Sequence, residues 1–248
     1  MSRRKGLSEQ LDLVEMPSAA EGAGTPPGAE GHRERLRQRL LSAGPDALND
    51  QDLLEIILFL ALPRRDTKSI AKALLARFGS FANAVAAPLN ELRSIEQMKD
   101  AGCAALKAVH AAALRLAKAE LKDRPLLTNW DRLMDYLNAV LARERVEQFR
   151  VLFLDTRNHL LADEAQARGT VNHTPVYPRE VVKRALELQA TALILVHNHP
   201  SGDPTPSRDD IAMTREVRDA AGVLNIVLHD HVIIGNGRWL SFRREGLL

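Results

Sequence analysis

The sequence has little cysteine, little net charge and no long apolar run, and each shortage excludes a class of protein. Cys103 is the only cysteine among 248 residues, which rules out an internal disulfide and a cysteine-rich zinc site and fits a reducing compartment. The formal net charge of +2 is too weak to indicate nucleic-acid or membrane binding by itself. No run approaches the roughly 18 apolar residues of a membrane span, and residues 1–20 lack the order of a secretion signal. We therefore expect a cytoplasmic protein that makes no membrane contact.

What the sequence does contain is enough apolar residues for two domains. Its 45% hydrophobic and 27% charged content is ordinary for a soluble globular protein, and its length suits two domains of roughly 100–150 residues each. Residues 1–30 mix Gly, Pro, Ser, Ala and Glu without periodicity, which predicts a disordered tail. Helical patterns fill residues 31–122, whereas strands and helices interleave over 126–248. We therefore expect an all-α domain followed by an α+β domain with a mixed sheet flanked by helices.

The helical half ends in a pattern that resembles a helix-hairpin-helix module. Helices are expected around 36–41, 50–60, 69–78, 88–92 and 101–121. Hairpins of this kind bind a DNA phosphate through backbone N–H groups exposed by a Gly-hydrophobic-Gly turn. Here Gln97 and Lys99 stand where the two glycines are expected, and without glycine a positive φ is costly. A helical packing or docking domain is the main interpretation, and DNA is an alternative partner weakened by these two residues.

The second half shows alternating strand and helix patterns. The predicted order is helix 130–142, strands 149–154 and 159–164, helix 178–188, strand 192–196, helix 208–220, and strands 224–234 and 239–242. This order predicts a hairpin followed by a strand–helix–strand unit.

The stretch 192–210 carries the clearest chemical signal. Five apolar residues predict a buried strand, and His197 and His199 follow at a spacing that projects both imidazoles to the same side. A loop rich in Gly and Pro leads to Ser207, an N-cap for the next helix, with Asp210 in the first turn. Two imidazoles and one carboxylate form the ligand set of a catalytic zinc site that keeps one position open. The competing interpretation is loop histidines beside an ordinary helix cap.

A second His-x-His pair is formed by His229 and His231. No carboxylate at a matching loop spacing follows it, and Asp230 is expected on the opposite face of its strand. One of these histidines is interpreted as a support for the site or part of its rim, otherwise as structural. The letters His-Asn-His at 197–199 do not indicate an HNH nuclease, because the residues of that motif are dispersed over a ββα unit.

These residues resemble a known motif. His197-Asn-His199-Pro200 followed by Ser207-Arg-Asp-Asp210 is similar to the His-x-His-Pro…Ser-x-x-Asp motif of JAMM (MPN-plus) zinc metalloproteases and isopeptidases. The surroundings resemble the bacterial RadC-like family (DNA repair protein RadC, UPF0758), closely over 125–242 and more loosely over 32–122. The matching segments are 149–155, 168–170, 177–183, 197–206 and 230–235. The resemblance implies a JAMM/MPN domain, of cytidine-deaminase-like architecture, joined to a helix-hairpin-helix-like domain.

The resemblance also assigns roles. In JAMM enzymes a glutamate before an early strand is the general acid/base, and Glu147 is the position that matches, with Glu164 and Glu180 as rivals. Ser207 would help to hold the oxyanion, and His197, His199 and Asp210 would bind one Zn²⁺ per chain.

Three functions are therefore considered. The leading hypothesis is a zinc-dependent hydrolase that cuts a peptide or isopeptide bond in a peptide or protein substrate. The first rival is a metal-dependent nuclease or phosphoesterase, which often uses two metals about 4 Å apart. The second is a DNA-associated repair or recombination factor that acts as an interaction module, with a structural or vestigial metal site.

Overall fold

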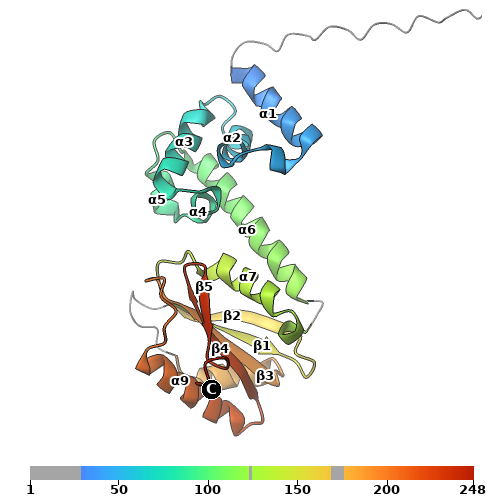
Figure 1. The fold of residues 1–248 in the computed structure, drawn as a ribbon, viewed down its shortest axis with the longest axis vertical. Coiled ribbons are helices and arrows are strands. Elements are labelled where there is room, and N and C mark those ends of the chain that lie inside the picture. Colours follow the sequence, from blue (N-terminus) through green and yellow to red (C-terminus); the bar gives the residue numbers. More distant parts are fainter. Residues whose placement is uncertain (1–28, 123–124, 169–175) are drawn as a thin grey trace, which may run out of the picture. The chain divides into compact units, whose positions relative to one another are not determined.

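The computed structural model describes residues 29–122, 125–168 and 176–248 (Figure 1). The chain divides into two compact units, with the boundary between Ala47 and Leu48. In the first unit, α1 (Ala29–Ala43) is followed by a 3₁₀ turn, η1 (Pro45–Ala47). Helix α1 begins inside the predicted tail, so the tail prediction is wrong for residues 29 and 30. The rest of that prediction falls on residues 1–28, outside the described part of the chain.

The second unit begins with five helices. They are α2 (Asp50–Ala61), α3 (Thr67–Phe78), α4 (Phe81–Ala86), α5 (Leu89–Arg93) and α6 (Asp100–Lys122). Their buried apolar side chains form one core, which includes Leu54, Leu58, Ile70, Leu74, Leu92 and Leu106. Helix α4 was not predicted; Ser80 caps it by accepting the N–H of Asn83. None of the helices in the described ranges is long and apolar enough to cross a membrane.

The turn between α5 and α6 has a backbone conformation typical of glycine, without a glycine. Gln97 has φ = 64°, in the left-handed region, and it occupies the position where the hairpin module has its first glycine. The conformation costs a residue with a Cβ about 1–2 kcal/mol. The hairpin-like backbone is therefore retained at Gln97, at a cost in stability.

The rest of the chain builds a five-stranded mixed sheet. Its strands are β1 (Gln148–Leu154), β2 (Leu160–Arg168), β3 (Ala192–Asn198), β4 (Val227–Gly235) and β5 (Arg238–Ser241). The strand order is β2-β1-β3-β4-β5. Strands β3 and β4 are parallel, and the other neighbouring pairs are antiparallel. Strand β3 is central and all seven of its residues are buried, which explains the unbroken apolar sequence of its first five residues.

Helices cover both faces of this sheet (Figure 1). Helix α7 (Trp130–Leu141) packs on one face, where its leucines meet Leu152, Ile194 and Val232. Helices α8 (Pro178–Glu187) and α9 (Arg208–Gly222) cover the other face, which carries Val151, Leu193 and Leu195. Neighbouring strand residues go to opposite cores, as the two-residue period of a strand requires. The expected α+β architecture with a mixed sheet between helices is confirmed.

Two predicted strand limits differ from the observed ones by three residues or more. Strand β4 begins at Val227 instead of Leu224, because residues 223–226 form the turn that ends α9, with Asn225 at φ = 57° and the N–H of Ile226 bonded to the carbonyl of Ala221. Strand β2 runs from Leu160 to Arg168, four residues beyond its predicted end. Pairing with β1 holds this polar segment in a strand that its own sequence does not signal.

We expect Gln97→Val to lower the free energy of unfolding by about 1–2 kcal/mol, because a β-branched side chain tolerates a positive φ poorly. Gln97→Gly should have a free energy of unfolding equal to or higher than that of the unaltered protein. Glu96→Val is the matched control, since Glu96 is exposed like Gln97 and lacks a positive φ. Thermal and urea unfolding measure the differences; equal effects of the two valine substitutions would contradict the strain at Gln97.

Candidate metal centre

The candidate metal centre starts at the carboxyl end of β3. His197 is the second-last residue of this strand and its side chain is only 1% exposed. Its ring stacks against Phe149 of β1 at 6.2 Å between centroids. Strand pairing explains the contact, because Phe149 lies opposite His197 in the β1–β3 register. A buried strand with a paired aromatic neighbour holds this imidazole in one orientation.

His199 lies one residue beyond β3 and starts the loop. Its backbone N–H still bonds to the carbonyl of Ile234 on β4. Its Nδ1 lies 2.8 Å from the backbone oxygen of Asp203, and because a carbonyl only accepts, Nδ1 carries the proton. The lone pair of His199 is therefore on Nε2, the atom that faces His197. The Asp203 carboxylate accepts the N–H and hydroxyl of Thr205, which fixes the loop that supplies this carbonyl.

A close approach between two glycines closes the loop against the sheet. Gly202 has φ = 83°, and a Cβ on Gly235, the last residue of β4, would lie 2.4 Å from the Gly202 carbonyl oxygen. Arg238 of β5 donates a hydrogen bond to the same carbonyl. Gly235 thus makes room for the turn that directs the chain from His199 toward α9.

Asp210 reaches the site from the first turn of α9. Ser207 is the N-cap and forms a capping box with it: the Ser207 oxygen accepts the Asp210 N–H, and Oδ2 of Asp210 accepts both the N–H and the hydroxyl of Ser207. The box fixes the carboxylate beside the imidazoles. Oδ2 is occupied by these donors, whereas Oδ1 faces His197.

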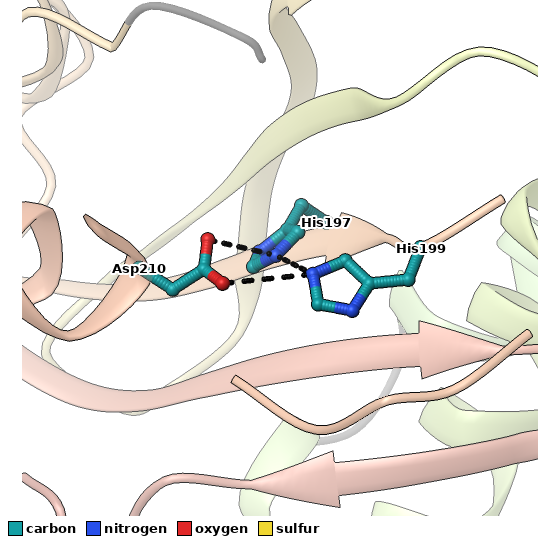
Figure 2. A group of neighbouring side chains, drawn as sticks. All are labelled: His197, His199 and Asp210. Carbon is teal, nitrogen blue, oxygen red and sulfur yellow. Dashed lines mark hydrogen bonds and ion pairs between the residues drawn. The ribbon is translucent and has the colours of Figure 1, made fainter. Parts of the chain in front are cut away.

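The three side chains converge on one point (Figure 2). The two Nε2 atoms are 3.0 Å apart, Oδ1 of Asp210 is 3.2 Å from His197 Nε2, and Oδ2 is 3.6 Å from His199 Nε2. In a tetrahedral zinc site with metal–ligand distances near 2.0–2.1 Å, neighbouring ligand atoms lie about 3.3 Å apart. The separations of His199 Nε2 and Asp210 Oδ1 from His197 Nε2, 3.0 and 3.2 Å, lie close to this value, so the residues present fit a metal ion of that size.

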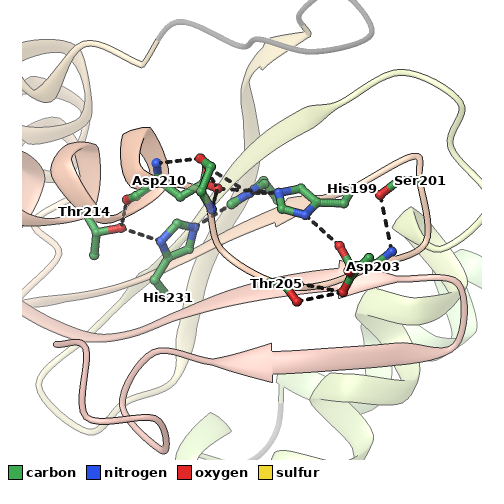
Figure 3. A network of polar contacts seen from close by, with 9 residues as sticks. His199, Ser201, Asp203, Thr205, Asp210, Thr214 and His231 are labelled. Atoms are coloured by element: carbon green, nitrogen blue, oxygen red, sulfur yellow. Dashed lines mark hydrogen bonds and ion pairs between the residues drawn. The ribbon is translucent and has the colours of Figure 1, made fainter.

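A buried hydrogen-bond chain directs the lone pair of His197 to the same point (Figure 3). The Thr214 hydroxyl donates its one proton to the Asp210 carbonyl at 2.5 Å, so it accepts from His231 Nδ1 at 2.6 Å. Burial lowers the pKa of His231 well below its usual value, so this ring is neutral and its Nε2 accepts from His197 Nδ1 at 2.8 Å. His197 is left with a bare Nε2. In its neutral form each of the two histidines therefore presents an unprotonated Nε2 at this point, as a metal ligand must.

The centre is open on one side. The side chains of Asp210 and His199 are 14% and 18% exposed, against 1% for His197, so water and a ligand approach past the first two. Burial opposes the charge of Asp210, but hydrogen bonds with both histidines hold its pKa well below its usual range. The pKa of His199 is raised, first by its hydrogen bond with Asp210 and, among smaller causes, by the charge of Glu147.

Glu147 lies next to this centre, immediately before β1. The β1–β3 register pairs Phe149 with His197, and continuing it by two residues brings Glu147 opposite His199. Asn198 fixes the backbone around Glu147: its amide oxygen accepts the N–H of Gln148, and its amide nitrogen donates to the carbonyls of Glu144 and Val146. Asn198 at the end of β3 thus holds the segment before β1.

The two rival glutamates have other partners. Glu164 on β2 forms a bidentate ion pair with Arg184 of α8 at 2.6 and 2.9 Å. Arginine lowers the pKa of its carboxyl group, which keeps Glu164 a poor proton acceptor. Glu180, in the first turn of α8, contacts its neighbour Arg179. Glu147 is therefore the glutamate of the three whose charge acts on His199.

Sequence reasoning missed several residues that support the site. His231 had been singled out only as one of two uncertain histidines, and Thr214 and Gly235 had given no signal. Thr214 lies four residues after Asp210 on α9, a helical spacing that places it on the same side. The contact of Gly235 with Gly202 depends on how β4 and the loop meet in space, which no local pattern reveals.

Comparison with known proteins agrees with this geometry. Residues 127–247 match the model of the RadC-like JAB domain, and residues 31–104 match that of the UPF0758 N-terminal domain. Of the segment 168–170, which carries part of the sequence resemblance, residues 169 and 170 lie outside the described ranges. The sheet, its flanking helices and the His-His-Asp group thus define a JAB (MPN-like) domain. A UPF0758 protein of Rhodobacter capsulatus is 59% identical over 86% of this chain and 100% of its own length. Another, of Ruegeria pomeroyi, is 52% identical over 88% of this chain and 97% of its own. The chain belongs to the UPF0758 family, as predicted. The domain limits 31–122 and 126–248 stay predictions.

Replacing His231 by phenylalanine should weaken zinc binding about 10–100-fold, because the buried Nδ1 proton of His197 loses its acceptor. His229→Phe, the same change on the same strand, should leave the affinity unaltered. Chelator competition measures both, with circular dichroism to confirm folding. Equal zinc affinities for the two variants would show that the hydrogen-bond chain does not orient His197.

Replacing Gly235 by alanine should both destabilise the protein, by about 1–3 kcal/mol, and reduce the zinc bound per chain, because the new Cβ displaces the Gly202 carbonyl and with it the loop between His199 and Asp210. Gly222→Ala is the control, since nothing lies within 4 Å of its Cβ position. Thermal unfolding and elemental analysis report the two effects; full zinc content in the Gly235 variant would refute the role of this approach.

Proposed function

We propose that the protein is a zinc-dependent hydrolase of the JAMM type that cleaves a peptide or isopeptide bond. The observation that carries the proposal is the convergence of two imidazole Nε2 atoms and a carboxylate beside a glutamate whose charge acts on His199. His197, His199 and Asp210 would hold one Zn²⁺ per chain. An open, thiolate-free set of three ligands is typical of catalytic zinc.

When bound, zinc would supply an electrophilic centre that activates water and polarises a carbonyl group. Glu147 would accept a proton from the attacking water as the new carbon–oxygen bond forms. It would then deliver that proton to the departing amine as the carbon–nitrogen bond breaks. Its position next to a histidine ligand, on a segment fixed by Asn198, favours this assignment over Glu164, which is engaged by Arg184.

Ser207 has two compatible roles in this proposal. Its hydroxyl proton is donated to Asp210 in the capping box, which orients the ligand. To stabilise an oxyanion it would have to rotate this proton toward the carbonyl oxygen of the substrate. A substitution at Ser207 therefore affects both metal binding and turnover, whereas a substitution at Glu147 should affect turnover and leave metal binding intact.

A role with DNA is the second candidate, favoured by the positive φ of Gln97. The hairpin turn keeps the backbone conformation that presents N–H groups to a phosphate in hairpin modules. This would suit a DNA-associated repair or recombination factor, or a nuclease. Against a nuclease stands a single group of three metal-binding side chains in the described residues, where phosphodiester cleavage often uses two metals.

The deciding variant is Glu147→Gln. It should keep about one zinc per chain and lose hydrolysis of a fluorogenic peptide library and of a lysine-isopeptide substrate by about 10²–10⁴-fold. Glu164→Gln is the control; it removes a carboxylate of the same kind and should keep both zinc and activity. Elemental analysis and initial rates measure the two properties.

Two results would overturn the proposal. Metal-dependent cleavage of single- or double-stranded oligonucleotides that is abolished in His197→Ala, without peptide cleavage, would establish the nuclease. Absence of bound metal in the unaltered protein after incubation with Zn²⁺ would favour the DNA-associated interaction module.

A further inference from the structure

A second hollow lies on the face of the sheet that α7 covers. It has a volume of about 500 Å³, and its lining includes Leu127, Trp130, His229, Asp230, Arg243 and Arg244. That volume is typical of sites for small molecules. His229 precedes Ile233, the partner of His197 in β4, by four residues. The hollow therefore lies toward the other end of β4 from the candidate metal centre, roughly 13 Å along the strand.

Two guanidinium groups border this hollow without a carboxylate partner. Arg244 stacks over the ring of Trp239 at 4.6 Å from its centroid and lies 5.9 Å from that of Trp130. Arg243 donates to the backbone carbonyl of His229 at 2.9 Å. Within residues 29–122, 125–168 and 176–248, neither arginine forms an ion pair. Both keep donors for a ligand.

The start of α7, where Trp130 lines the hollow, holds two donors that have no partner in the described structure. The Nε1–H of Trp130 and the side-chain N–H₂ of Asn129 are buried and have no hydrogen-bond partner in the described structure. Asn129 is the N-cap of α7, yet its side chain accepts no N–H from the helix. Buried donors without acceptors are rare in folded proteins and call for an explanation. A ligand that brings acceptor oxygens supplies one.

The acidic group in the hollow is already used by the protein. Asp230 is 4% exposed, and its carboxylate accepts the N–H groups of His231 and Arg243 and the hydroxyl of Ser241. It thereby fixes the turn from which both arginines project. Burial, aided by Arg243, lowers the pKa of His229, so this histidine stays neutral. The remaining positive charge belongs to the two guanidinium groups.

We propose that this hollow binds the phosphate monoester group of a small organic ligand. The paired guanidinium groups and the Trp130 N–H suit the three terminal oxygens of a phosphate, one more than a carboxylate offers. Leu127 and the Trp130 ring would contact the organic part. The site is independent of the proposed hydrolase, because it shares no residue with the candidate metal centre.

The two tryptophans make the test direct. Trp130 and Trp239 are the only tryptophans in the chain, and both contact Arg244, so intrinsic fluorescence reports on the surroundings of this arginine. Titration of the full chain with phenyl phosphate should give a saturable change. Inorganic phosphate should bind more weakly, benzoate more weakly than phenyl phosphate, and phenol not at all. Calorimetry should return the same order of affinities.

Variants complete the test. Arg244→Gln should weaken phenyl phosphate binding at least about tenfold, and Arg244→Lys less, because it keeps the charge but loses the bidentate geometry. Arg218→Gln removes an exposed arginine on α9 that pairs with Asp219 and should change the affinity by less than about twofold. Melting temperature and zinc content confirm that each variant is folded. Any one of three results would overturn the proposal. They are the absence of a saturable change in fluorescence, equal affinities for benzoate and phenyl phosphate, and equal losses of affinity in Arg244→Gln and Arg218→Gln.

Discussion

The structure depends most on one requirement: a buried imidazole needs an acceptor for its proton. His197 lies inside the sheet, where an unpaired N–H would be costly. His231 and Thr214 meet this requirement. They come from β4, the parallel neighbour of β3 in the sheet, and from α9, which covers one face of the sheet. The same chain that satisfies the buried proton also leaves Nε2 bare toward Asp210. The burial of His197, the order of the strands and the orientation of His197 Nε2 therefore depend on one another.

The second structural requirement is the return of the chain from β3 to α9. The loop must leave a central strand, turn sharply and present Asp210 at 3.2 and 3.6 Å from the Nε2 atoms of the two imidazoles. Gly202 allows the turn, Gly235 allows its close approach to β4, and the Asp203 carbonyl fixes the ring of His199. The capping box then holds Asp210 at the other end. Helix capping and ligand placement use the same carboxylate, so the helix start and the site form together.

The sequence was informative where the signal is local. The apolar run 192–196, the His-x-His spacing and the Ser-x-x-Asp cap are patterns within a few residues, and they predicted the strand, the loop and the convergence of His197, His199 and Asp210. It was uninformative where contacts are distant. The pairing of β1 with β3, which brings Glu147 opposite His199, and the His197–His231 contact, 34 residues apart, depend on strand order. Polar strand β2 and the late start of β4 were misjudged because neighbouring strands and a turn override local propensity.

Asn198 gives the end of β3 an unusual sensitivity to sequence length. Successive residues of a strand alternate between its two sides, so His197 and His199 face the metal position while Asn198 reaches the segment that carries Glu147. An insertion or deletion of one residue in β3 immediately before His197 would exchange these directions. The histidine side chains would then point toward the segment before β1, and the Asn198 side chain would point toward the candidate metal position. We therefore expect variation in length to be confined to the outer part of the loop. Residues 197–199 should be kept together without insertions or deletions.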